Sequence, residues 1–328
     1  MNKPTTKLLI TGGAGFVGHH FVEHFLKNTD WDMVVVDRLS YSGSLDRLRD
    51  INAFDSRRVL TLTADFTQPI AENLEREIGE VDYIFHMGAE THVDNSITDP
   101  VRFVISNVVG TQHVIDFARR QHNLSKFFYF STDEVFGSIA EGFSEINDPH
   151  NPSNPYSATK SGGEMLVKAA INTYGLPGII TRTMNIIGER QHPEKFVPMC
   201  INRILKGETV TIHSNADRTK AGSRMYIHAR NVADGYMHLI EHGAVGKDYH
   251  IVGQEEIDNL DLARTIAAIL AKELNYEMVD FHSSRPGHDL RYALSPNSMT
   301  EIGWSPPKAF RDSLEKTVQW TISNPKWL

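Results

Sequence analysis

The residues best suited to chemistry lie in two neighbouring segments of the chain, residues 130–137 and 156–160. The first segment follows an apolar run and carries Thr132, Asp133 and Glu134, a hydroxyl beside two adjacent carboxylates. A buried parallel strand has this pattern when it delivers polar side chains to its carboxyl end, where open α/β sheets bind ligands. The segment therefore offers a carboxylate pair and a hydroxyl at this edge of a sheet.

The second segment carries Tyr156 and Lys160, which are four residues apart and so share one face of a helix. A nearby ammonium favours the phenolate, so Lys160 is expected to lower the pKa of Tyr156 from its ordinary value of about 10. Tyr156 is then a usable general base. Together the two segments predict proton transfer coupled to hydride transfer.

A strand, a glycine turn, a helix and a second strand ending in an acid occupy residues 7–37. Gly12, Gly15 and Gly18 have the spacing of a dinucleotide-binding turn, in which the backbone approaches a pyrophosphate at a helix N-terminus. Asp37 is placed to bind a ribose 2′-hydroxyl, which favours NAD. Arg38 keeps NADP open as the alternative, because an arginine there can accept the 2′-phosphate.

Strands and helices alternate regularly up to about residue 184, with further strands expected at residues 59–64, 81–87, 127–130 and 178–183. A helix is expected from about residue 100 to residue 122. This alternation predicts a Rossmann-like, doubly wound parallel α/β sheet. Residues 1–184 are expected to form the NAD-binding domain, and residues 185–328 mainly a smaller α/β substrate-binding lobe with returns to the sheet. Asp65, at the end of one strand, is read either as an adenine-side residue or as a helix cap.

The composition excludes several classes of protein. A net charge of −8 over 328 residues argues against general nucleic-acid binding. No apolar run approaches the roughly 20 residues of a membrane span, and no signal peptide is recognised. The single cysteine, Cys200, excludes an intramolecular disulfide and fits a cytoplasmic protein. No histidine pair has convincing metal-ligand spacing, so no metal is predicted.

These motifs resemble those of the nucleoside-diphosphate-glucose 4,6-dehydratases, which are extended short-chain dehydrogenases/reductases. The resemblance extends over almost the whole chain and is carried by the glycine turn, Tyr156-x-x-x-Lys160 and further segments at residues 37–43, 88–94, 131–137, 154–160, 193–198 and 285–289. Its specific part is the triplet Thr132-Asp133-Glu134, because related epimerases and decarboxylases usually lack the acid pair. Within this family the sequence is most similar to the dTDP-glucose enzymes, followed by the UDP-glucose enzymes.

The resemblance implies a complete reaction. Tyr156 takes the proton of the sugar C4 hydroxyl while NAD accepts the C4 hydride, Thr132 holds that oxygen, and Lys160 binds the nicotinamide ribose. Glu134 then removes the C5 proton, Asp133 protonates the departing C6 hydroxyl, and hydride returns to C6. The product is a 4-keto-6-deoxy sugar.

The resemblance also implies the binding residues and a homodimer joined through a helix bundle that includes the Tyr156 helix. The expected cofactor residues are Gly12, Gly15, Phe16, Val17, Gly18, Asp37, Arg38, Leu39, Ser40, Asp65, Phe66, Met87, Gly88, Ala89, Thr91, Ser106, Tyr156, Lys160 and Ile186. The expected substrate residues are Thr91, Thr132, Asn185, Lys195, Phe196, Arg224, Asn259, Arg285 and His288.

The chain departs from the family pattern mainly on the substrate side. Asn185 is followed by Ile186 where relatives often carry a second asparagine, Asn95 and Asn231 stand where an arginine and an acid are common, and residues 214–223 form a longer stretch than usual. The nucleobase therefore stays open between dTDP and UDP. A 4-epimerase or decarboxylase is the alternative enzyme, and a non-catalytic dinucleotide sensor is the alternative outside catalysis.

Overall fold

The computed structural model describes residues 5–280 and 291–328, and the chain divides into two compact units. The first unit comprises Met1–Val135, Asn154–Arg182 and Tyr236–Tyr249, and the second comprises Phe136–Ser153, Thr183–Gly235 and His250–Leu328. Both segments that carry the expected catalytic residues, 132–134 and 156–160, therefore belong to the first unit.

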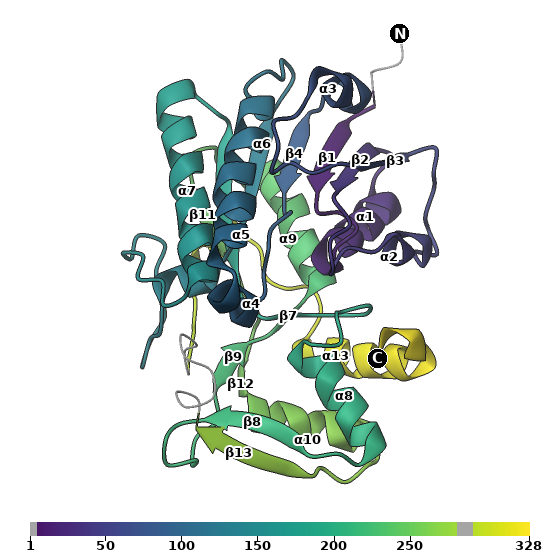
Figure 1. Ribbon diagram of the computed structural model, residues 1–328, viewed down its shortest axis with the longest axis vertical. Helices are drawn as coiled ribbons and strands as arrows, with labels where there is room; N and C mark the ends of the chain where they lie inside the picture. The colour runs from purple at the N-terminus through teal and green to yellow at the C-terminus, as the bar shows by residue number, and fades with distance from the viewer. Residues whose placement is uncertain (1–4, 281–290) are drawn as a thin grey trace. The chain divides into compact units, whose positions relative to one another are not determined.

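A seven-stranded sheet with the order β11-β6-β5-β4-β1-β2-β3 forms the centre of the first unit (Figure 1). Its strands are β1 Lys7–Thr11, β2 Asp32–Asp37, β3 Val59–Thr63, β4 Tyr83–His86, β5 Lys126–Thr132, β6 Gly178–Thr183 and β11 Asp248–Ile251. β1 pairs in parallel with both β2 and β4, so the chain order reverses on either side of β1. This reversal is the point at which open α/β sheets bind ligands. The expected Rossmann-like fold is confirmed.

Helices follow the strands of the first unit. They are α1 Phe16–Asn28, α2 Leu45–Arg49, α3 Glu72–Ile78, α4 Val93–Thr98, α5 Pro100–Val104, the π-helical turn η1 Ile105–Val109, α6 Gly110–Ala118 and α7 Pro155–Tyr174. β5 runs into the short 3-10 turn η2, Asp133–Phe136, and α9, Ala229–His242, begins in the second unit and ends in the first. α7 ends because Gly175 adopts a left-handed conformation with φ 67°.

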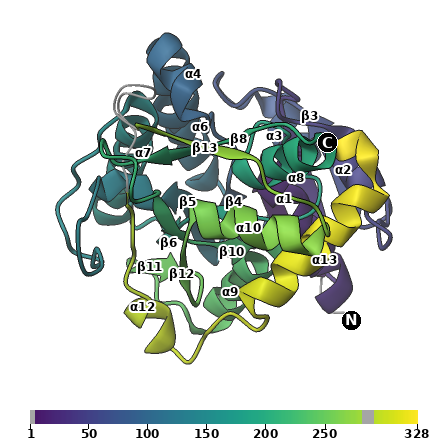
Figure 2. The ribbon, with the colours of Figure 1, turned by 90° about the horizontal axis from the view of Figure 1, so that it is seen from below.

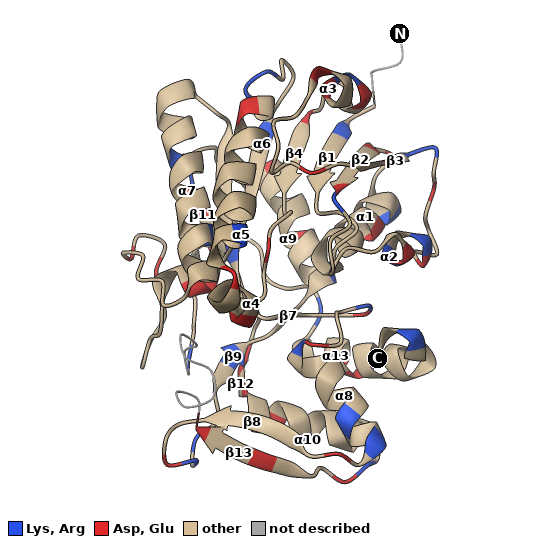
Figure 3. Ribbon diagram, in the orientation of Figure 1, with Lys and Arg blue, Asp and Glu red and all other residues tan. Residues whose placement is uncertain are grey.

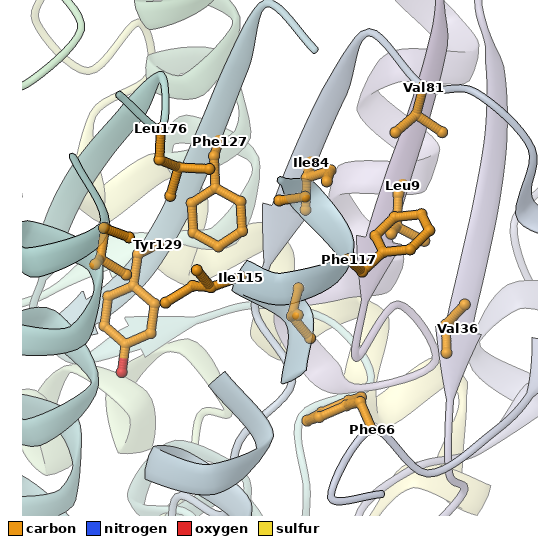
Figure 4. Packing of buried hydrophobic residues seen from close by; sticks show 14 of the residues in the cluster. Leu9, Val36, Phe66, Val81, Ile84, Ile115, Phe117, Phe127, Tyr129 and Leu176 are labelled. Carbon is orange, nitrogen blue, oxygen red and sulfur yellow. The ribbon is translucent and has the colours of Figure 1, made fainter. Parts of the chain in front are cut away.

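The core of the first unit lies between the sheet and its helices (Figure 4). Leu9, Ile84 and Phe127 come from the neighbouring strands β1, β4 and β5, and Ile115 and Phe117 come from α6. All five side chains are fully buried. Because each such burial stabilises the fold by about 1.5–3 kcal/mol, this cluster holds the carboxyl ends of the strands in a fixed arrangement.

The prediction of a single helix over residues 100–122 is wrong in two respects: η1 interrupts the helix, and the helix ends at Ala118. The side chain of Asn107, in this turn, bonds to the backbone of Glu90: its Oδ1 accepts from the Glu90 N–H at 2.8 Å, and its Nδ2 donates to the Glu90 carbonyl at 3.0 Å. Nδ2 also donates to Thr159 Oγ1 on α7 at 3.0 Å. A π turn adds one residue to a helical turn and re-aims the side chains around it. Here the side chain of Asn107 connects the loop after β4 to α7, the helix that carries Tyr156.

The second unit consists of short strand pairs packed on helices. Its strands are β7 Ile186–Ile187, β8 Val210–Ser214, β9 Ser223–Met225, β10 Ile227–His228, β12 Glu256–Asp258 and β13 Tyr276–Asp280. Its helices are α8 Phe196–Lys206, α10 Asn259–Ile269, α12 Asn297–Thr300, α13 Phe310–Ser323 and the 3-10 turn η3 Pro325–Trp327. α10 and α13 lie side by side (Figure 2) and bury Leu262, Ile266 and Leu314 between them and their neighbours.

Charged residues of both signs occur along the described part of the chain. Lys and Arg are interspersed with Asp and Glu on elements of both units (Figure 3), in keeping with the net charge of −8. Among the helices of residues 5–280 and 291–328, none is long and apolar enough to cross a membrane.

Candidate active site

At the glycine turn between β1 and α1, backbone segments approach each other closely at the edge of the sheet. Gly12 has φ 72°, and a Cβ there would lie 2.7 Å from Gly88 Cα. A Cβ at Gly18 would lie 2.3 Å from the Gly12 carbonyl oxygen. Gly15 is the N-cap of α1, and no side chain caps the first turn of that helix. Its amide groups are therefore available to an anion such as a pyrophosphate.

Asp37 closes this turn from the end of β2. Its Oδ2 accepts a hydrogen bond from the Ala14 N–H at 3.0 Å, and its Oδ1 accepts one from the Leu39 N–H at 2.8 Å. Burial raises the pKa of Asp37 above its ordinary value, although both backbone hydrogen bonds lower it. Each carboxylate oxygen can accept a second bond, so Asp37 fits the ribose hydroxyls of NAD as well as holding the loop.

Arg38, the residue that left NADP open, is engaged by two carboxylates. Its guanidinium forms an ion pair with the buried Glu90, and it lies 3.9 Å from Asp65. Arg102 donates to the same Glu90 oxygen at 2.8 Å. Because Arg38 faces carboxylates, the first unit fits NAD better than NADP.

The remaining predicted cofactor residues of the first unit lie around this edge. Asp65 forms a turn by accepting from the Thr67 N–H at 2.9 Å, and it does not cap α3, whose N-cap is Ala71. A Cβ at Gly88 would lie 2.3 Å from the ring of Phe66, so these two residues are packed tightly. The others occupy four places: Phe16 and Val17 open α1, Leu39 and Ser40 follow β2, Met87, Ala89 and Thr91 follow β4, and Ser106 is buried in η1.

A buried chain of hydrogen bonds supports the close approach of Gly12 and Gly88. Thr11 Oγ1 accepts from the Gly88 N–H at 3.2 Å and bonds to His86 Nδ1 at 2.8 Å, while His86 Nε2 bonds to Thr111 Oγ1 at 3.0 Å. Thr111 in turn donates to the Asn107 carbonyl at 2.6 Å. Because Thr111 uses its proton there, His86 must donate from Nε2 and accept at Nδ1. Burial lowers the pKa of His86 to about 3, so the ring stays neutral.

The Thr111→Val variant is expected to lower the free energy of unfolding by about 1–3 kcal/mol, because it leaves the buried Nε2–H of His86 without its acceptor. Urea unfolding monitored by circular dichroism measures the change. Thr98→Val is the matched control, since Thr98 also donates to a carbonyl four residues earlier, at 3.2 Å, but is exposed. Equal losses in the two variants would contradict the role of the chain of hydrogen bonds.

The carboxylate pair lies where β5 passes into η2. Thr132 and Asp133 are buried, and the Thr132 hydroxyl donates to Asp133 Oδ1 at 2.9 Å. Glu134 is partly exposed, and its N–H lies 3.4 Å from Thr132 Oγ1. Two adjacent carboxylates thus occupy different environments, which is the condition for one to act as an acid and the other as a base.

Tyr156 and Lys160 reach the same edge from α7. The ring of Tyr156 is buried against Phe103 of α5, with ring centroids 6.4 Å apart, and its hydroxyl hydrogen-bonds to Thr132. The Lys160 ammonium donates to the Phe130 carbonyl at 2.6 Å and lies 4.3 Å from the centre of the Tyr129 ring. The first unit therefore brings all five expected catalytic residues to the end of β5.

The expectation that Lys160 lowers the pKa of Tyr156 is wrong for this arrangement. Burial raises the Tyr156 pKa above its ordinary value, and the nearby Glu134 adds to the rise, while the hydrogen bond with Thr132 lowers it. Burial also lowers the pKa of Lys160 to about 7. The cause is geometric, because the lysine ammonium is directed to the end of β5 and to Tyr129.

Asn154 is a site residue that the sequence reasoning missed. It is the N-cap of α7, and its Nδ2 donates to Glu134 Oε2 at 3.1 Å. An asparagine before a proline at a helix start is a readable capping signal. The contact of Asn154 with Glu134, twenty positions earlier, cannot be read from the sequence, because it depends on how β5 and α7 pack.

The expected substrate residues lie mainly in the second unit. β9 and β12 pair there, with Arg224 opposite Ile257. Arg224 is buried, its guanidinium lies 4.6 Å from the centre of the Tyr292 ring, and the Tyr226 hydroxyl donates to Asn259 Oδ1 at 2.6 Å. An arginine backed by an aromatic ring and a side-chain amide suit a diphosphate.

The other predicted substrate-side residues are more dispersed. The Asn185 carbonyl accepts from the Ile227 N–H at 3.1 Å, Lys195 is the N-cap of α8 and Phe196 is its first residue. Ile186, a predicted cofactor residue, lies in β7. Thr91 belongs to the first unit. Arg285 and His288 lie outside the described residues. Within residues 5–280 and 291–328, no group of three or more His, Cys, Asp or Glu side chains could hold a metal ion.

Comparisons with known proteins place this geometry among nucleotide-sugar enzymes. Residues 8–252 match the model of the NAD dependent epimerase/dehydratase family. The chain is 35% identical to dTDP-glucose 4,6-dehydratase 1 of Escherichia coli K12, over 98% of this chain and 94% of that protein. It resembles the crystal structure of DesIV, a dTDP-glucose 4,6-dehydratase from Streptomyces venezuelae solved with NAD bound, with a TM-score of 0.89, 35% identity and 98% coverage of both chains. It also resembles a UDP-glucose 4-epimerase from Thermus thermophilus in complex with NAD, with a TM-score of 0.84, 26% identity and coverage of 96% and 98%.

Proposed function

Because the chain belongs to the NAD-dependent epimerase/dehydratase family, we propose that it is a hydro-lyase that converts dTDP-glucose to its 4-keto-6-deoxy product. The observation that carries this proposal is the acid pair Asp133-Glu134 beside Tyr156 at the end of β5. A 4-epimerase needs a base at C4 and a hydride carrier, but it needs no acid and base for the neighbouring carbons. Dehydration needs all three groups.

NAD, when bound, supplies the hydride acceptor at C4, the hydride donor at C6 and a positively charged ring near the reacting carbons. Gly12, Gly15 and Asp37 would hold it, because they combine an uncapped helix N-terminus with a carboxylate at the end of β2. Lys160 would bind its nicotinamide ribose through the ammonium.

Tyr156 takes the proton of the C4 hydroxyl, with Thr132 holding the oxygen through a hydrogen bond. The resulting 4-keto group acidifies the C5 hydrogen, which Glu134 removes. Asp133 gives a proton to the C6 oxygen, so that it leaves as water. Asp133 is buried and Glu134 is partly exposed, so the two carboxylates occupy different environments, as an acid and a base that act together require.

The proposal favours dTDP-glucose over UDP-glucose because the relatives and DesIV carry the dTDP-glucose name. Arg224 and Asn259 of the second unit would bind the diphosphate, which both nucleotides share. A 4-epimerase is the second candidate, favoured by the similarity to the Thermus enzyme.

A product assay tests the proposal. The protein is incubated with NAD and with dTDP-glucose or UDP-glucose in separate reactions, and the products are identified by mass spectrometry and NMR. A 4-keto-6-deoxy sugar from dTDP-glucose, formed faster than from UDP-glucose, is expected. A C4 epimer with the mass of the substrate would contradict dehydration, and faster reaction of UDP-glucose would contradict the choice of base.

The protein is further proposed to be a homodimer through α5, η1 and α7. Val101, Val104, Ile105 and Val109 are between 39% and 64% exposed at helical spacing, and Met165 of α7 is 45% exposed. α7 contacts both α5 and η1, so these exposed apolar side chains come from adjacent elements, and we propose that they form one apolar surface. Such a surface is typical of a protein interface. A cytoplasmic location remains a prediction.

The Val104→Glu variant is expected to be monomeric, because it places a charge in this apolar surface. Sedimentation should give a mass near twice 37.0 kDa for the unaltered chain and near 37.0 kDa for the variant. Val245→Glu is the matched control, since Val245 is 47% exposed on a loop outside these helices. A dimer that survives Val104→Glu would contradict this interface.

A further inference from the structure

Asn154 has a fixed side-chain orientation at the start of α7. Its Oδ1 accepts from the Ser157 N–H at 2.9 Å, and Ser157 Oγ bonds reciprocally to the Asn154 backbone, accepting from its N–H at 3.3 Å and donating to its carbonyl at 3.0 Å. The backbone at Asn154 is extended, with φ −143° and ψ 163°, as an N-cap requires. The residue is only 5% exposed. The amide oxygen is therefore committed to the helix.

The amide nitrogen must then face away from the helix, and it faces Glu134. Nδ2 donates to Glu134 Oε2 at 3.1 Å. The two amide atoms cannot exchange roles, because an exchange would turn an N–H toward the Ser157 N–H. The Asn154 side chain thus connects the start of α7, the helix that carries Tyr156, to the Glu134 carboxylate after β5.

We propose that Asn154 is a positioning residue for the elimination step, which directs Glu134 toward the C5 hydrogen and stabilises its carboxylate form. The proposal rests on the function proposed above for Glu134. Glu134 is partly exposed on a short 3-10 turn, where a long side chain has several rotamers available. A hydrogen bond from an amide held by a helix cap selects one of them, and a hydrogen bond to a carboxylate favours its charged form.

The hydrogen bond between Asn154 and Glu134 also affects Tyr156, the second proton acceptor of the proposed reaction. The Glu134 charge disfavours the Tyr156 phenolate, which shows that the two groups lie within electrostatic reach of each other. A donor on the Glu134 carboxylate draws part of that charge toward Asn154, so it eases proton acceptance by Tyr156 as well. A residue that served only as a helix cap would have neither effect.

Asn154→Asp separates these roles. Asn and Asp are similar N-caps, so the start of α7 should be retained. The donor is lost and a second carboxylate faces Glu134. This like charge disfavours ionisation of Glu134. On acidification, Glu134 should therefore be protonated, and stop acting as a base, at a higher pH than in the wild-type protein. The acid limb of the kcat/KM profile is expected to move to higher pH. Dehydration at neutral pH should fall by about 10- to 100-fold.

Asn154→Ser supplies the same test without a second charge. Serine is also a good N-cap, but its hydroxyl is too short to reach the Glu134 carboxylate from that position. Its kcat should fall by about tenfold with a smaller pH displacement, because positioning is lost but no repulsion is added. Urea unfolding of both variants controls for the cap. Wild-type kcat and an unmoved acid limb in both variants would overturn the proposal.

Failure of this proposal is distinguishable from failure of the proposed function. Exchange of the C5 hydrogen with deuterated solvent is measured for both Asn154 variants and for Glu134→Gln. If Glu134→Gln loses the exchange and the Asn154 variants keep it at the wild-type rate, only the positioning role is wrong. If Glu134→Gln keeps the exchange, the base assignment itself is wrong and the positioning role falls with it.

Discussion

The Tyr156→Phe variant is expected to lose at least about 10²- to 10⁴-fold in the rate of dehydration, the range that a general base contributes. Phenylalanine keeps the ring that packs on Phe103 and Val93, so the substitution removes only the hydroxyl. The hydroxyl that is removed is the one that hydrogen-bonds to Thr132, the residue proposed to hold the C4 oxygen. Steady-state product formation at saturating NAD measures the loss.

The control for this prediction is Tyr174→Phe on the same helix. Tyr174 is 54% exposed at the C-terminal end of α7, so its variant should retain wild-type turnover. Tyr174→Phe should leave NAD binding unchanged, and Tyr156→Phe should still bind NAD, because the glycine turn and Asp37 stay intact in both variants. Turnover by Tyr156→Phe within tenfold of wild type would contradict the assignment of Tyr156 as the base at C4.

The Glu134→Gln variant is expected to stop the reaction after the first half. Glutamine has nearly the same shape and can still accept the hydrogen bond from Asn154, so the local structure should persist. It cannot take a proton, so release of the 4-keto-6-deoxy product should fall by about 10²- to 10⁴-fold. Oxidation at C4, which depends on Tyr156, should continue.

Reduction of bound NAD on addition of substrate reports the first half-reaction, and C5 exchange reports the second. The Glu134→Gln variant should reduce bound NAD but should not exchange the C5 hydrogen. Glu145→Gln is the control, because Glu145 is an exposed carboxylate of the loop that follows η2. Product formed by Glu134→Gln at the wild-type rate would exclude Glu134 as the C5 base.

Much of the first unit could be read from the sequence. The strand expected at residues 178–183 has those bounds in the structure, and the second strand ends at Asp37 as expected. Gly12 could be assigned to a backbone approach because few other functions require glycine at that spacing, and its contact with Gly88 shows what it approaches. These are local signals.

The features that could not be read depend on contacts between distant segments. The π turn at residues 105–109 is stabilised by Asn107 bonding to Glu90, and helical periodicity carries no sign of that partner. The direction of the Lys160 ammonium is set by the Phe130 carbonyl and Tyr129, so spacing from Tyr156 alone predicted the wrong pKa direction. The same applies to the hydrogen bond between Asn154 and Glu134.

The most direct test of the central claim is the fate of the hydrogen at C4. dTDP-glucose carrying deuterium at C4 is incubated with the protein and NAD, and the product is analysed by NMR. The account predicts a 4-keto-6-deoxy sugar with deuterium at C6, because the hydride removed from C4 returns to C6 after water has left. A product that keeps its C6 hydroxyl and carries deuterium at C4 would contradict dehydration and identify an epimerase.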